Sequence, residues 1–251
     1  MQAEIKGSTL PVLEMILDPG EAVISNHGEL SWMTTNMQMT QTAAMGGKGG
    51  GLMGGLKRVM SGTSIFLTRY EPSGGQGMVA FAAKVPGRIF PLEVGGANGG
   101  YLVHKHGWVC GTPEISATVG FQQGIGGMLF GGEGFILQKL EGQGTAWVEL
   151  SGEITTYDLA AGQGLLVHPG HVGVFQDTVQ FQVTRVQGIA NRYMGADGHW
   201  LVVLTGPGKV WLQSMPLPIL AASLQEYMKG DGAKDAMAGG AVGGVLGSIL
   251  R

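Results

Sequence analysis

Two closely spaced pairs of histidines have the clearest potential for chemistry in this 251-residue chain. His104 and His106 stand two positions apart. His168 and His171 flank a Pro-Gly dipeptide. Imidazoles two positions apart on a strand face the same side of a sheet and can bind one metal ion. One hypothesis is therefore a cupin-like metal-dependent enzyme that uses these four histidines.

A structural role is the competing interpretation of the same histidines. The positions four and five residues after His106 hold Cys110 and Gly111, so the carboxylate that would complete a metal site is missing there. Duplicated modules keep residue types at equivalent strand positions, which explains His104 and His168 without a metal. We therefore expect hydrogen-bonded histidines, with no catalytic residue, no metal and no cofactor.

The remaining chemical motifs are weak. Residues 49–54 match G-x-G-x-x-G, but about 1.6 chance matches are expected in a chain this rich in glycine. Ser64 lacks the G-x-S-x-G nucleophile elbow. The pattern around Cys110 is apolar and predicts a buried thiol. Glu149 and Glu153 flank a turn and are expected to be solvated.

The elements that must position these residues are short strands. Apolar and polar residues alternate in 37–40, 145–150 and 179–184, as in half-buried strands, and glycine-rich or proline-containing turns recur between such segments. This pattern predicts an all-β sandwich or barrel. One helix is expected over 216–229, where Pro218 suits the first turn.

Self-comparison of the chain indicates internal repeats. Three pairs of segments correspond at offsets of 65, 64 and 67 residues: 87–94 with 152–159, 102–104 with 166–168, and 75–77 with 142–144. An ordered run of matches at nearly one offset is typical of duplicated units.

A third copy is predicted from the match of 86–89 with 207–210 at an offset of 121. We therefore expect a single all-β body over residues 1–215, built from three modules over about 8–94, 95–159 and 160–215 in a pseudo-threefold arrangement. The helix over 216–229 and a glycine-rich apolar tail over 230–251 follow this body.

Composition excludes several classes of protein. Glycine makes up 47 residues, charged residues only 13%, and the formal net charge is −3. A chain without a basic field or a run of Lys and Arg is a poor binder of nucleic acid, so an RNA-binding module is only a second alternative. A single cysteine excludes an internal disulfide.

Location and assembly are expectations from the two ends of the sequence. Residues 1–18 contain four charged side chains and no unbroken apolar core, so we expect a cytoplasmic protein. The uncharged tract 236–250 is shorter than a membrane-spanning helix. Peripheral membrane contact by loop 46–55 or by the tail is left open. Ordering the apolar tail requires a partner surface, which favours a homo-oligomer.

A set of glycine-rich motifs gives the chain a family resemblance. They are Asp-Pro-Gly-Glu at 18–21, the loop 46–55, Gly-Thr-Ser-Ile-Phe at 62–66, Gly-Gly-Glu-Gly-Phe at 131–135 and Leu-Thr-Gly-Pro-Gly-Lys-Val-Trp-Leu-Gln-Ser at 204–214. Over residues 10–215 the chain resembles the mitochondrial-biogenesis family named for altered inheritance of mitochondria, which has prokaryotic members. The resemblance implies repeated β-sandwich or double-stranded β-helix modules related to the tryptophan RNA-binding attenuation protein. Mitochondrial relatives are linked to inner-membrane organisation, and prokaryotic members have no assigned activity.

The resulting functional expectation is a non-enzymatic oligomeric scaffold or interaction protein with an unidentified protein partner. A role in membrane organisation is implied only by the resemblance. The metal-dependent enzyme and the RNA-binding module are the alternatives.

Overall fold

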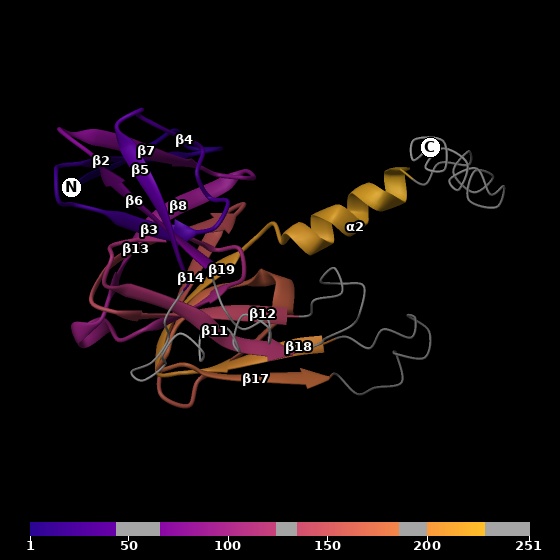
Figure 1. Ribbon diagram of the computed structural model, residues 1–251. Helices are drawn as coiled ribbons and strands as arrows, with labels where there is room; N and C mark the ends of the chain where they lie inside the picture. Colours follow the sequence, from indigo (N-terminus) through magenta and orange to yellow (C-terminus); the bar gives the residue numbers. More distant parts are fainter. Residues whose placement is uncertain (44–65, 124–134, 186–199, 229–251) are drawn as a thin grey trace, which may run out of the picture.

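The computed structural model describes residues 1–43, 66–123, 135–185 and 200–228. Most of these residues lie in antiparallel strands, and one short α-helix follows the last strand (Figure 1). The predicted all-β class with a C-terminal helix is confirmed. Loop 46–55, Ser64, the motif 49–54 and the tail 230–251 lie outside the described residues.

The strands after β1 (Gln2–Lys6) form three sets of six in chain order. The first set is β2 (Val12–Leu17), β3 (Val23–Asn26), β4 (Trp32–Met33), β5 (Met37–Ala43), β6 (Phe66–Pro72) and β7 (Gly77–Ala82). The second set is β8 (Gly87–Val94), β9 (Tyr101–His104), β10 (Trp108–Gly111), β11 (Ile115–Gln123), β12 (Phe135–Gly142) and β13 (Gly144–Ser151). The third set is β14 (Ile154–Leu159), β15 (Gly164–Val167), β16 (Val172–Gln176), β17 (Gln180–Arg185), β18 (Trp200–Thr205) and β19 (Gly208–Gln213).

The same hydrogen-bonding pattern recurs in every set. The sixth strand pairs with the first and the third, as in β7 with β2 and β4, β13 with β8 and β10, and β19 with β14 and β16. The fifth strand pairs with the fourth and the second, as in β6 with β5 and β3, β12 with β11 and β9, and β18 with β17 and β15. Two further pairings, β3 with β10 and β9 with β16, join successive sets.

The register corrects one predicted alignment. Gly77, Gly144 and Gly208 pair with Leu17, Val94 and Leu159, so all three glycines begin a sixth strand. Gly87 begins a first strand, and its predicted equivalence with Gly208 is therefore wrong. Both turns have the composition Pro-Gly followed by an alternating strand, which is why the local match misled.

The hydrogen-bonded sets cover 12–82, 87–151 and 154–213. The expected modules 8–94, 95–159 and 160–215 place β8 and β14 at the end of the preceding module instead of at the start of the next, and they remain a prediction about how the chain was duplicated.

The four sheets stack, with three hydrophobic cores between them. The four-stranded sheet β1-β2-β7-β4 packs on the six-stranded sheet β5-β6-β3-β10-β13-β8. This sheet packs on the second six-stranded sheet, β11-β12-β9-β16-β19-β14, around the fully buried Trp108. The second sheet then packs on the three-stranded sheet β15-β18-β17. In Figure 1 the outer strands β2 and β7 lie at the opposite end of the body from β17 and β18.

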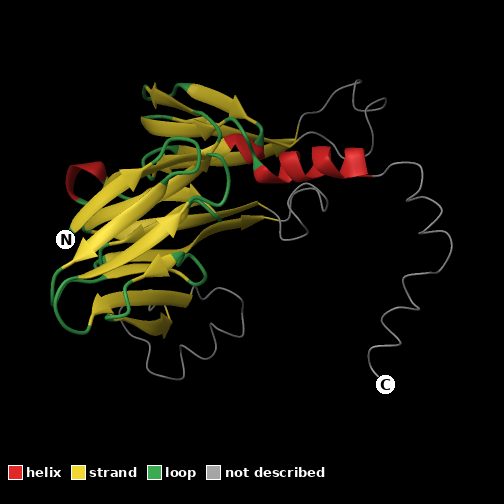
Figure 2. Cartoon of the chain, turned by 90° about the horizontal axis from the view of Figure 1, so that it is seen from above, coloured by secondary structure: helices red, strands yellow, loops and turns green. Residues whose placement is uncertain are grey.

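The helix α2 (Leu217–Met228) leaves the body after β19 and projects away from it (Figures 1 and 2). Pro218 occupies the first turn, where its missing N–H costs no helical hydrogen bond. The helix expected over 216–229 is thus confirmed. Within the described ranges, no helix combines the length and the apolar character needed to span a bilayer.

Two short 3-10 turns complete the fold: η1 (Gly96–Asn98) between β8 and β9, and η2 (Pro169–His171) between β15 and β16. The second of these lies beside the start of α2, where the chain leaves the stacked sheets.

Candidate functional site

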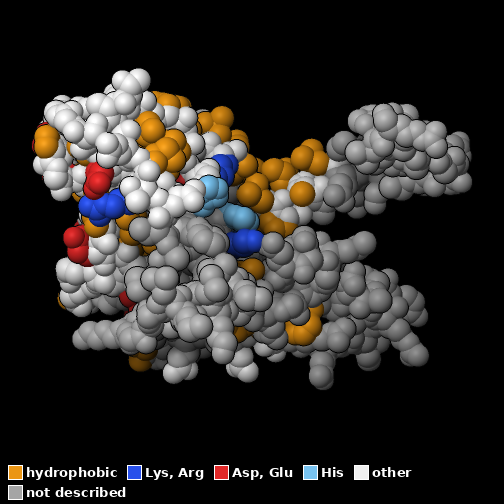
Figure 3. All heavy atoms as spheres, viewed as in Figure 1, with side chains coloured by type: hydrophobic (Ala, Val, Ile, Leu, Met, Phe, Trp, Pro, Cys, Tyr) orange, Lys and Arg blue, Asp and Glu red, His pale blue; other side chains and the backbone are white. Residues whose placement is uncertain are grey.

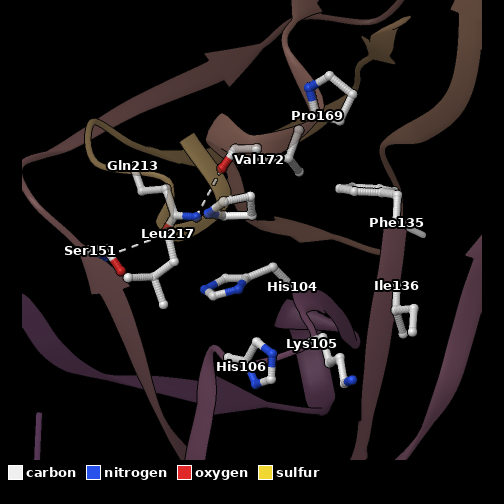
Figure 4. Close-up of a pocket in the computed structure, with 12 residues that line it drawn as sticks. His104, Lys105, His106, Phe135, Ile136, Ser151, Pro169, Val172, Gln213 and Leu217 are labelled. Atoms are coloured by element: carbon white, nitrogen blue, oxygen red, sulfur yellow. Dashed lines mark hydrogen bonds between the residues drawn. The ribbon is translucent and has the colours of Figure 1, made fainter. Parts of the chain in front are cut away.

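A pocket of about 110 Å³ lies where α2 joins the body. Its walls come from the β9–β10 turn, the start of β12, the end of β13, η2 and β16, the end of β19 and the first turn of α2. Figure 4 shows Phe135 and Ile136 on one side, Ser151 and Gln213 on the other, and His104 between them. In Figure 3, histidine and basic side chains gather at the root of the projecting helix.

The β9–β10 turn carries the first histidine pair. Gly107 N–H donates to the carbonyl of His104 at 2.8 Å, which closes the turn. A Cβ at position 107 would lie 2.7 Å from Cδ2 and Nε2 of His104, so the imidazole packs directly over the glycine. Only a residue without a side chain leaves this space.

The His104 ring is neutral in the folded protein. Its Nε2 lies 3.4 Å from the carbonyl oxygen of Glu149, and because a carbonyl can only accept, Nε2 carries the proton. Burial of the ring lowers the pKa of His104 to about 4, and the nearby His106 and Lys84 act in the same direction. The hydrogen bond to Glu149 opposes this shift without cancelling it.

The second histidine pair lies in and next to η2. The two rings are 5.9 Å apart between centroids. His168 Nδ1 accepts a hydrogen bond from Gly170 N–H at 3.3 Å, and His171 Nδ1 donates to the carbonyl of Gln213 at 2.8 Å. Both rings therefore hold the backbone of the turn.

The structure thus separates the four predicted metal ligands into two pairs. His104 and His106 line the pocket, whereas His168 and His171 contact each other beside it. Across the described part of the chain, no three His, Cys, Asp or Glu side chains form a group that could hold a metal ion. Three of the four rings, those of His104, His168 and His171, make the hydrogen bonds described above.

Gln213 is a central residue of the site that the sequence analysis did not single out. Its side chain is 6% exposed. Its Oε1 accepts from Ser151 N–H at 3.1 Å, and its Nε2 donates to Gly170 C=O at 3.0 Å. One amide therefore joins the ends of β13 and β19 to η2. Its place in the 204–214 motif was the available signal.

Ser151 was also missed. It is 4% exposed and lines the pocket, yet its hydroxyl has no hydrogen bond to any residue that the structure describes. Ser151 is the last residue of β13, and nothing in the local sequence distinguishes it from a solvated serine at a strand end.

The neighbouring Glu149 corrects a second prediction. It was expected to be solvated but is 5% exposed, because β13 lies in the interior of the stack and both of its faces are covered. Its Oε1 accepts from Lys84 N–H at 3.0 Å, and Lys84 Nζ lies 2.5 Å from Glu29. Burial raises the pKa of both carboxyl groups. Glu153 is exposed, as expected.

Cys110 is buried, as predicted. Burial raises the pKa of its thiol well above the ordinary range, so the reactive thiolate is disfavoured.

Comparisons with known proteins agree on the fold. A family model described as "Mitochondrial biogenesis AIM24" matches residues 3–215. An uncharacterised protein of Streptococcus pyogenes serotype M6, M6_Spy0233, is 28% identical over 225 residues, which cover 87% of each chain. The crystal structure of protein SPYM3_0169 from Streptococcus pyogenes covers 90% of this chain and 99% of its own, at 23% identity and a TM-score of 0.69. The last comparison shows a shared fold.

Proposed function

Since this chain belongs to the mitochondrial biogenesis AIM24 family, we propose that it serves as a non-enzymatic, cytoplasmic scaffold or interaction protein that assembles into a homo-oligomer. Membership of this family does not specify an enzymatic reaction. The proposal rests on one observation, the projecting helix α2.

The apolar surface of α2 supports assembly. The helix reads LPILAASLQEYM, with Glu226 as its only charged residue. Leu220 is half-buried and Leu224 is 53% exposed. An isolated helix of this length is marginal in water and is normally stabilised by packing an apolar face. An exposed and a half-buried leucine on a helix that leaves the body therefore favour a partner surface.

A second copy of the chain is the partner that we propose. The net charge of −3 in 251 residues gives little electrostatic repulsion between copies. In a symmetric oligomer every copy contributes the same surface to the interface. The apolar surface of α2 would then be buried in every copy.

The test is the mass of the full-length protein in solution by size-exclusion chromatography with light scattering. We expect a multiple of the 26.1 kDa chain mass, and a reduction to 26.1 kDa for the double variant Leu220→Gln, Leu224→Gln. The matched control is Leu166→Gln on β15, a leucine that is 63% exposed and remote in sequence from α2. A wild-type mass of 26.1 kDa contradicts the homo-oligomer.

The same preparation tests the enzyme alternative. Elemental analysis of protein purified without chelators is expected to show no stoichiometric metal. A stoichiometric metal that is lost in His106→Ala contradicts a non-enzymatic scaffold and favours the metal-dependent alternative.

A further inference from the structure

The pocket at the root of α2 has an apolar side and a polar side, and this division points to a ligand. We propose that it binds a small organic anion: a monocarboxylate whose apolar body is about the size of a benzene ring. This inference concerns a ligand site in each chain and does not depend on the oligomeric state proposed above.

The apolar wall fits a compact hydrocarbon group. Phe135 is 3% exposed, Val172 is fully buried, and Ile136, Leu217 and Pro218 extend the wall towards the mouth. A volume of about 110 Å³ is smaller than the roughly 150 Å³ of an engineered cavity that accepts benzene, so one small ring is the upper limit for a fully enclosed group. The size and the lining together limit the ligand body to about one small ring or a short branched chain.

The polar wall contains a hydroxyl that can act as a hydrogen-bond donor. Ser151 is 4% exposed, and its hydroxyl makes no hydrogen bond to the described residues. Ser151 lines the pocket, where its hydroxyl can donate a hydrogen bond to a carboxylate oxygen of a ligand. The Gln213 amide cannot replace Ser151, because its oxygen and nitrogen are already bonded to the backbone at Ser151 and Gly170.

The charge of the lining favours an anion over a cation. Lys105 and His106 line the pocket, and none of the described lining residues is Asp or Glu. In Figure 4 these two side chains lie together on the same side of His104. The buried carboxylate of Glu149 accepts from the backbone N–H of Lys84, and the main-chain carbonyl of Glu149 contacts His104. A carboxylate would therefore meet positive charge and a hydroxyl donor.

The walls are held in place without a ligand. Gln213 ties β13, β19 and η2 together through two buried hydrogen bonds, and His171 adds a third at the Gln213 carbonyl. Gly170 packs so closely that an added Cβ would lie 2.9 Å from Cβ of Pro216. A preformed pocket loses little conformational entropy when it binds.

Titration of the full-length protein with benzoate, followed by NMR, tests the proposal. We expect saturable shifts of amide signals around the pocket, with a Kd on the order of 1 mM for a ligand of this size. Benzyl alcohol keeps the ring without the charge, and acetate keeps the charge without the ring. Each should bind at least about tenfold more weakly than benzoate if both walls contribute. Equal binding of all three, or no saturable shift with benzoate, overturns the proposal.

Variants locate the site. Ile136→Trp fills the pocket from its half-buried edge and should abolish the benzoate shifts, whereas Leu166→Trp on an exposed face should leave them unchanged. Ser151→Ala should weaken binding at least about threefold without lowering the melting temperature, because it removes a hydroxyl that has no described partner. Unaltered benzoate affinity in a folded Ile136→Trp protein places the binding elsewhere. Light scattering on the same samples distinguishes this result from a failure of the oligomer proposal.

Discussion

Two turns occupy the same place in successive strand sets but use their histidines differently. His104 ends β9 in the second set, and His168 follows β15 in the third. The His104 ring donates to the main-chain carbonyl of Glu149 on β13, whereas the His168 ring accepts from Gly170 within its own turn. A shared residue type at a repeated position therefore does not imply a shared role.

The residues after each histidine explain the difference. Gly107 leaves room for the His104 ring to fold over the turn. Pro169 starts a 3-10 turn in which the backbone itself faces His168. The first set has Asn26 at the corresponding register, and its amide donates to the carbonyl of Trp108 at 3.3 Å. Each set therefore has a polar side chain at this register, and each side chain binds a different backbone group.

Removing the amide that holds the third-set turn should have the largest effect. We expect Gln213→Ala to lower the free energy of unfolding by about 2–4 kcal/mol, since it leaves a buried N–H at Ser151 and a buried C=O at Gly170 without partners. Urea unfolding followed by circular dichroism measures this change. The control Gln180→Ala removes an exposed amide and should cost little. Similar losses in both variants would mean that the η2 turn does not depend on Gln213.

Crowding the second-set turn should have a smaller effect. Gly107→Ala should cost about 1–3 kcal/mol, because its Cβ would overlap the His104 ring and Cγ1 of Val103. The cost should fall in a His104→Ala background, where the ring is gone. Gly74→Ala, with no atom within 4 Å of the added Cβ, is the control. An unchanged cost in the double variant would show that the ring does not limit the space.

Acid should expose the remaining difference between the turns. Between pH 6.5 and about 4 the unfolded chain binds a proton at His104 that the folded protein excludes, so stability falls as the pH falls through this window. Relative to His104→Asn, wild type should lose about 1–2 kcal/mol, reduced from the full shift because the ring keeps some solvent contact.

Glu29 and Glu149, whose pKa values are raised, act in the opposite direction and are common to both proteins. The difference between wild type and His104→Asn therefore isolates the imidazole. His27→Asn, an exposed histidine, serves as the control. Parallel stability curves for wild type and His104→Asn would contradict a neutral buried ring.

Much of the architecture could be predicted from local pattern. Alternation indicated the strands, Pro218 marked the start of the helix, and the apolar neighbours of Cys110 predicted its burial. The equivalence of 75–77 with 142–144 agrees with the register, in which both segments lead into a sixth strand. Each of these features depends on a few consecutive residues, so it can be predicted from the local sequence.

The candidate site could be predicted only in part. The histidines drew attention to the β9–β10 and β15–β16 turns, and the structure places both turns beside one pocket or in its wall. Ser151 and Gln213 gain their importance from being brought together by strands 62 residues apart. A local sequence pattern cannot predict a contact between residues this far apart in the chain.

The sequence alone determined an all-β protein with an apolar helix after the last strand, because propensity and periodicity act over a few residues. The tertiary structure decided which strand faces are buried. Alternation assumes one solvated face, whereas β13 is covered on both, so Glu149 is enclosed and Ser151 borders a pocket. The stacking of four sheets sets this burial, and it depends on contacts between strand sets far apart in sequence.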